Sequence, residues 1–230
     1  MHTYKSARRS LRGNKQVCIQ VAREGAIFHM MLDRPQQLNA IDAPMRDALY
    51  EMFCNVRADA SIEAVILHGN GKGFCAGADL TEFGEAHTVL QKRRIRLQHD
   101  VWELIRTCDK LTVAMLHGFA IGSGLELAML CDVRIASEET MFALPEAAIG
   151  MMPAAGGTQS LPRLTNLAHT MEIAITGKRF NAQEAWQYGI VQQVVQRQAL
   201  QETTVQYVEK VLAQPHWRTL QRQIRASTDG

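Results

Sequence analysis

The chain has 230 residues, of which 47% are apolar and 21% charged, so it is long enough to bury a core and its composition argues against whole-chain disorder. It holds 25 Lys and Arg against 23 Asp and Glu, and this near balance argues against a strongly basic nucleic-acid binder. The five cysteines are widely spaced and form no CxxC motif, which indicates a reducing compartment without a disulfide framework or a zinc knuckle.

The N-terminal residues 1–16 carry five basic side chains and no acidic one, and we expect a solvated, disordered tail. A targeting arm or a contact with a polyanion is the alternative. The segment has no apolar stretch like that of a secretory signal. The most apolar long stretch, 114–130, contains His117, Ser123 and Glu126, so it does not predict a membrane span.

Two short strands are predicted at residues 17–21 and 26–32, on either side of a Glu-Gly turn. Asp42 then has the residue type of a helix N-cap and is followed by Pro44 in the first turn. Apolar residues recur from there at i, i+3, i+4, i+7, i+8 and i+11, which predicts an amphipathic helix. These residues are Met45, Ala48, Leu49, Met52, Phe53 and Val56.

The remaining chain alternates between strand-like and helix-like segments. Strands are predicted at 64–68, 112–116, 133–136 and 141–143, and helices over most of 82–109, at 125–130 and beyond Ala154. Asn181, with Glu184 three residues later, predicts a capped helix start. Such alternation predicts an α/β fold with mostly parallel strands, followed by a helical C-terminal region.

Two glycine-containing loops are candidates for binding a ligand through the backbone. Residues 69–79 (GNGKGFCAGAD) loosely match a dinucleotide fingerprint, but that pattern belongs on a first strand–helix unit, and here two strands and a helix precede it. Small residues let N–H groups approach a ligand, although a plain glycine-rich turn is the alternative. The second loop, 122–124 (GSG), leads into a helix start, where free N–H groups attract negative charge. One donor from each loop would suit a developing oxyanion.

Two glutamates lie in apolar sequence surroundings, Glu126 in the helix 125–130 and Glu146 twenty residues later. A buried carboxyl group is costly unless it is paired or its pKa is raised, and a raised pKa suits general acid–base catalysis. The alternative is that each glutamate is exposed or caps a helix end. Asp132 and Arg134 are candidates for a structural ion pair. Ile121 stands where a nucleophile elbow needs glycine, and no Ser–His–Asp set is apparent.

Together these residues resemble the crotonase (enoyl-CoA hydratase/isomerase) superfamily over about residues 17–213. The resemblance is carried by motifs in a fixed order. They are Asp33-Arg34-Pro35, Leu38-Asn39-Ala40, residues 73–80, residues 122–128, Cys131-Asp132, Phe142-x-x-Pro145-Glu146 and Gly156-Gly157-Thr158-Gln159.

The resemblance implies a crotonase-like spiral of ββα turns over residues 17–180 and a helical C-terminal region over 181–230, shorter than is usual for the family. It also implies an acyl-CoA thioester as substrate, with coenzyme A as part of that substrate, no separate cofactor and no metal. We expect a cytoplasmic enzyme with neither DNA nor membrane as a partner. A homotrimer or a dimer of trimers is expected, weakened if the C-terminal region is short.

For the site, the resemblance implies that the thioester carbonyl is held by the backbone N–H groups of Ala78 and Ser123. Glu126 would activate the attacking water and Glu146 would deliver a proton to the α-carbon. The loop 34–40 would lie near the nucleotide part of coenzyme A. The substrate-binding residues implied are Ala76, Ala78, Asp79, Leu80, Thr81 and Ser123.

The presence of both glutamates favours an enoyl-CoA hydratase. Ser123 and Ala154 stand where such hydratases usually have glycine, which leaves another crotonase-type reaction (isomerisation, decarboxylation or thioester hydrolysis) as an alternative. The basic tail and the end of the chain at Gly230 leave a weakly active, RNA-associated family member as a further alternative.

Overall fold

A computed structural model describes residues 18–82 and 100–228. The predicted tail 1–16 and most of the helix predicted over 82–109 lie outside the described residues. The strands are β1 (Ile19–Glu24), β2 (Ile27–Leu32), β3 (Ala64–Gly69), β4 (Leu111–Leu116), β5 (Phe119–Ile121), β6 (Val133–Ser137), β7 (Met141–Ala143), β8 (Phe180–Asn181) and β9 (Gln193–Val195). The helices are α1 (Ala43–Ala58), α3 (Val101–Arg106), α4 (Ser123–Met129), α5 (Gly157–Leu164), α6 (Leu167–Thr176), α7 (Ala182–Gln187), α8 (Leu200–Leu212) and α9 (Trp217–Thr228). Short 3-10 helices are η1 (Pro35–Gln37), η2 (Leu80–Glu82), η3 (Pro145–Ile149) and η4 (Arg197–Ala199).

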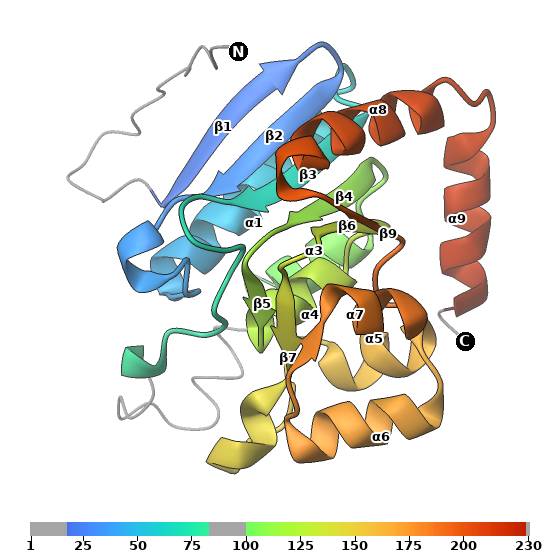
Figure 1. The fold of residues 1–230 in the computed structure, drawn as a ribbon. Helices are drawn as coiled ribbons and strands as arrows, with labels where there is room; N and C mark the ends of the chain where they lie inside the picture. Colours follow the sequence, from blue (N-terminus) through green and yellow to red (C-terminus); the bar gives the residue numbers. More distant parts are fainter. Residues whose placement is uncertain (1–17, 83–99, 229–230) are drawn as a thin grey trace.

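The strands form a large and a small sheet, and most of their pairings are parallel. The large sheet has the order β1-β2-β3-β4-β6-β9, in which only the β1–β2 pair is antiparallel. The small sheet has the order β5-β7-β8. In Figure 1, α8 lies across the large sheet, and α5, α6 and α7 gather beside β7 at the other end of the molecule. The predicted α/β architecture with mostly parallel strands is therefore confirmed.

The large sheet is buried on both faces. Val65 and Leu67 of β3 pack in the cluster that contains the apolar face of α1, whereas Ala64 and Ile66 pack in the cluster that contains α8. Burial on both sides explains why β3 is a continuous apolar run rather than an alternating one. The glycine-rich loop 69–79 begins at the end of this buried strand.

Helix starts follow the predicted caps. The Asp42 side chain accepts a hydrogen bond from the N–H of Met45 at the start of α1. At the start of α7, Asn181 and Glu184 form the predicted capping box, in which each side chain accepts from the other residue's N–H. Both caps place an oxygen acceptor on N–H groups that have no partner inside the helix.

Residues 181–230 are not wholly helical. Strand β9 pairs with β6 and extends the large sheet, so the region predicted as a helical appendage contributes to the core fold. Three residues are too few to show a strand periodicity. The expectation for this region is corrected on this point.

The predicted ion pair between Asp132 and Arg134 is also corrected. The buried guanidinium of Arg134 donates instead to backbone carbonyls, among them those of Cys131 and Ile190. Asp132 pairs with Arg225 of α9, with 2.6 Å between Oδ1 and Nη2. The end of α4 leaves carbonyl groups without helical partners, and these carbonyls attract the guanidinium.

Candidate active site

The segment that carries Ala78 is held against Ile41 by a parallel bridge. The N–H of Ile41 donates to the carbonyl of Gly77 at 2.8 Å, and the N–H of Asp79 donates to the carbonyl of Ile41 at 3.0 Å. Successive N–H groups of an extended segment point to opposite sides. The N–H of Ala78 therefore points away from Ile41.

The two glycine-containing loops lie directly against each other at Gly77. A Cβ built on Gly77 would lie 2.9 Å from the carbonyl oxygen of Ile121 and 3.5 Å from the nitrogen of Ser123. Gly77 also has a φ of 103°, a conformation that favours glycine. Ser123 is the first residue of α4, so its N–H has no acceptor within that helix. The N–H groups of Ala78 and Ser123 thus come from two adjoining backbone segments.

Glu126 is buried, with 1% of its surface exposed. Its Oε1 accepts hydrogen bonds from the N–H of Gly157 at 2.7 Å and of Ala155 at 2.9 Å. Burial raises the pKa of Glu126 above its ordinary value, while these two N–H groups and the hydroxyl of Ser123 oppose that shift. The alternative of an exposed glutamate at this position is wrong.

Glu146 lies in the first turn of η3 and borders the second loop. A Cβ built on Gly122 would lie 3.0 Å from Oε1 of Glu146. Burial raises the pKa of Glu146, and its buried Oε2 has no hydrogen-bond partner in the part of the chain that the structure describes. The charge of Glu146 also raises the pKa of Glu126, so the two carboxyl groups are close enough to interact.

The remaining predicted substrate-binding residues lie along the first loop. Ala76 and Asp79 are partly buried, whereas Leu80 and Thr81 are exposed at the start of η2. The carboxylate of Asp79 accepts hydrogen bonds from the hydroxyl of Thr81 at 2.7 Å and from Nη2 of Arg34 at 3.2 Å. These bonds hold the pKa of Asp79 below its ordinary value. Asp79 is therefore tied into the protein, and the exposed Leu80 is available to a ligand.

Sequence reasoning gave no role to Ala155 and Gly157, whose N–H groups bind Glu126. The available signal was the Pro-Ala-Ala-Gly-Gly run before a helix, which marks a turn with free N–H groups. The ring of His117 is held by the backbone of the first loop, because its Nε2 lies 3.0 Å from the carbonyl oxygen of Gly71.

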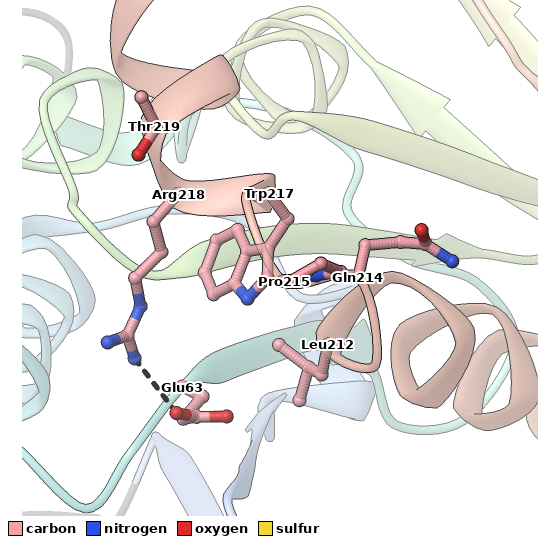
Figure 2. Close-up of a pocket in the computed structure, with 7 residues that line it drawn as sticks. All are labelled: Glu63, Leu212, Gln214, Pro215, Trp217, Arg218 and Thr219. Atoms are coloured by element: carbon pink, nitrogen blue, oxygen red, sulfur yellow. Dashed lines mark hydrogen bonds and ion pairs between the residues drawn. The ribbon is translucent and has the colours of Figure 1, made fainter.

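A surface pocket of about 260 Å³ lies at the turn between α8 and α9 (Figure 2). Across it, Nη2 of Arg218 forms an ion pair with Oε1 of Glu63 at 3.2 Å. The residues that line it are Glu63, Leu212, Gln214, Pro215, Trp217, Arg218 and Thr219. None of the candidate site residues lines this pocket.

Within residues 18–82 and 100–228, His, Cys, Asp and Glu side chains do not gather in threes in a way that would hold a metal ion. Over the same residues, each helix is too short or too polar to cross a membrane. The site itself has two backbone donors beside two carboxyl groups of raised pKa, which suits carbonyl polarisation and proton transfer.

Comparison with known proteins gives a consistent picture. Residues 22–229 match the family model described as enoyl-CoA hydratase/isomerase. The short-chain-enoyl-CoA hydratase of Clostridium acetobutylicum is 33% identical over 192 residues, which cover 83% of this chain and 74% of that protein. The mitochondrial enoyl-CoA hydratase of Pongo abelii is 36% identical over 182 residues, 79% of this chain and 62% of that protein. A crystal structure of an enoyl-CoA hydratase subunit I from Geobacillus kaustophilus superposes with a TM-score of 0.85 at 32% identity, covering 93% of this chain and 83% of that one.

Proposed function

Because the chain belongs to the enoyl-CoA hydratase/isomerase family, that is, to the crotonase superfamily, we propose that it adds water across the α,β double bond of an enoyl-CoA thioester. The observation that carries this proposal is the placement of two glutamates: buried Glu126 accepts two peptide N–H bonds, and Glu146 borders Gly122 of the second loop. They adjoin the backbone segments of Ala78 and Ser123, one from each loop. The superfamily fold expected from the sequence agrees with the structural match.

In the proposed mechanism, the N–H groups of Ala78 and Ser123 donate hydrogen bonds to the thioester carbonyl oxygen. This polarisation makes the β-carbon electrophilic and stabilises the enolate-like charge that develops on the oxygen. Glu126 accepts a proton from water as the water oxygen bonds to the β-carbon. Glu146 gives its proton to the α-carbon, and exchange with solvent then resets both carboxyl groups.

The finer details are part of the same proposal. Ala76, Asp79, Leu80 and Thr81 would line the path of the acyl and pantetheine groups, with Leu80 supplying exposed apolar surface at its edge. A place in fatty acid metabolism, a cytoplasmic location and assembly as a homotrimer or dimer of trimers remain predictions. They are supported only by the resemblance to the family.

Hydration of crotonyl-CoA, followed by the loss of enoyl absorbance, tests the proposal. We expect Glu126→Gln and Glu146→Gln each to lower kcat by about 10²- to 10⁴-fold, the usual contribution of a positioned acid or base. Glu202→Gln is the matched control, because Glu202 is an exposed glutamate of α8. Unchanged turnover in both site variants would refute the assigned mechanism.

A second reaction in the same site is favoured by one observation. The hydroxyl of Ser123 interacts with Glu126, so the base carries an additional donor that a glycine at this position would not supply. Such a donor favours the charged form of Glu126, which is the form that a base needs to remove a proton in an isomerisation. A panel of acyl-CoA esters, including a 3-enoyl-CoA, analysed by liquid chromatography with mass spectrometry separates this reaction and the decarboxylation and thioester hydrolysis from hydration. Activity confined to the hydration of 2-enoyl-CoA would rule the second candidate out.

A further inference from the structure

The loop 34–41 holds the segment around Ala78 at three points. Backbone hydrogen bonds of 2.8 to 3.0 Å join this loop to Ala76, Gly77 and Asp79, so bonds flank Ala78 on both sides. A shift of the loop would therefore change the direction of the Ala78 N–H.

The side chain of Arg34 fixes that loop from within. Its Nη2 lies 3.0 Å from Oδ2 of Asp42 and 3.2 Å from Oδ2 of Asp79, and its Nη1 donates to the carbonyl of Ala40. Only 13% of the Arg34 side chain is exposed. One guanidinium thus joins the start of α1, the loop itself and the residue that follows Ala78.

The chemistry of this contact requires an arginine. A planar guanidinium reaches several acceptors in fixed directions, whereas a lysine ammonium is a single point charge on a flexible stem. The two carboxylates are also largely buried, with 17% of the Asp42 and 13% of the Asp79 side chain exposed, so solvent screens the pairs only weakly.

We propose that Arg34 is a positioning residue for the oxyanion hole, which aims the N–H of Ala78 at the thioester carbonyl by clamping Asp79 to Asp42 and to the loop 34–41. This inference rests on the proposed use of Ala78 in that hole. It assigns to Arg34 a role in transition-state stabilisation, although the side chain itself touches no substrate.

Deletion of an oxyanion donor lowers kcat by about 10²- to 10³-fold. A donor that is present but misdirected should lose only part of this transition-state stabilisation. We therefore expect Arg34→Met to lower kcat by about 10- to 100-fold and to change KM by a smaller factor, because the oxyanion contact is made mainly in the transition state. Arg34→Lys keeps the positive charge but lacks the planar guanidinium with its several fixed donors. Compared with Arg34→Met, it should restore most of the thermal stability but a smaller share of the lost kcat.

The experiment compares these two variants with Arg225→Met. Arg225 of α9 forms a similar, partly buried pair with Asp132 (2.6 Å), and its guanidinium also donates to the carbonyl of Cys108, outside both glycine-containing loops. Four quantities are measured on the full chain: kcat and KM with crotonyl-CoA, the thermal midpoint, and the absorbance of bound dimethylaminocinnamoyl-CoA. That conjugated thioester absorbs at longer wavelength when its carbonyl is polarised, so it reports on the hole without turnover.

The proposal is supported if both Arg34 variants bind the probe with a smaller red shift and a lower kcat, while Arg225→Met loses only thermal stability. It is overturned if the Arg34 variants keep the full red shift and kcat, or if the wild type binds the probe with no shift. If Arg34→Met does not fold, Arg34→Lys alone decides between these outcomes. A wild type that shifts the probe but hydrates no enoyl-CoA refutes the proposed reaction and leaves the inference on Arg34 standing.

Discussion

The contact between Gly157 and Glu126 gives the most specific prediction on the site. A Cβ built on Gly157 would lie 2.8 Å from Oε1 and 3.1 Å from Cγ of Glu126, and 2.7 Å from Cβ of Pro153. Non-bonded carbon atoms are at their best separation at about 3.5–4.0 Å, so the substitution Gly157→Ala forces its neighbours apart. The ring of Pro153 is rigid and buried, and the displacement therefore falls mainly on the carboxylate of Glu126.

Two free-energy effects oppose each other in the stability of Gly157→Ala. Overpacking lowers the free energy of unfolding by about 1–3 kcal/mol, whereas replacing a helical glycine by alanine raises it by up to about 1 kcal/mol. Gly157 is not among the residues with positive φ, so alanine meets no backbone strain there. We expect a net loss of about 0–3 kcal/mol, which in a domain of this size lowers the thermal midpoint by at most about 12 °C.

The effect on turnover is expected to be larger. Catalytic geometry must hold to within about 0.5 Å, and a misplacement of about 1 Å costs about 10²-fold. Gly157→Ala should thus lower kcat for crotonyl-CoA by about 10- to 100-fold in a protein that remains folded at the assay temperature. Thr158→Ala is the control, since Thr158 is the exposed next residue of α5. Wild-type kcat in Gly157→Ala would refute the placement of Glu126 at the reacting centre.

Three further predictions follow from single contacts. Ser123→Ala removes a hydroxyl that lowers the pKa of Glu126, so the acidic limb of the kcat/KM profile should move to higher pH. Asn181→Ala breaks the capping box of α7 and should cost about 1 kcal/mol of unfolding free energy in a denaturant titration, with kcat unchanged. Burial lowers the pKa of His68 from 6.5 to about 4, so the folded state resists its protonation. The unfolding free energy that neutral His68 contributes is fully present above about pH 6.5 and falls by up to roughly 3 kcal/mol as the pH is lowered to 4. In His68→Gln, the unfolding free energy should therefore decrease less steeply over this pH range.

Each of these predictions has its own contrary result. An acidic limb that stays in place in Ser123→Ala would mean that the hydroxyl does not reach the ionised base. An Asn181→Ala protein as stable as the wild type, measured beside Gln183→Ala as the exposed control, would mean that the cap contributes nothing. Equal acid sensitivity of the wild type and His68→Gln would assign the decline to other groups.

The elements that the sequence predicted well carry their own local signals. Helix α1 has a capping aspartate and sixteen residues with apolar spacing, and β3 is an unbroken apolar run between turns. The strands that were not predicted from the sequence are short: β5, β8 and β9 have three, two and three residues. Such strands exist because a distant partner is present, as when β9 pairs with β6, and no local periodicity encodes that partner.

The site shows the same division between residue type and placement. The apolar sequence neighbours of Glu126 indicate a carboxyl group in apolar surroundings, and the side chain is indeed buried in the structure. Its hydrogen-bond donors come from Ala155 and Gly157, about thirty residues later, where the chain has already passed through β6, β7 and η3. Arg134 is a similar case, because the carbonyls that bind it become neighbours only when the end of α4 and Ile190 meet.

The environments of the two glutamates differ in a way that favours hydration over reactions with a single acid. Both carboxyl groups have a raised pKa through burial, but Glu126 accepts two peptide N–H bonds that favour its charged form. Glu146 has a buried Oε2 without a partner in the described part of the chain, which favours its neutral form. Because the two carboxyl groups interact, they titrate as a coupled pair. Addition of water needs a base and an acid at the same moment, and in the proposed mechanism Glu126 and Glu146 supply one each.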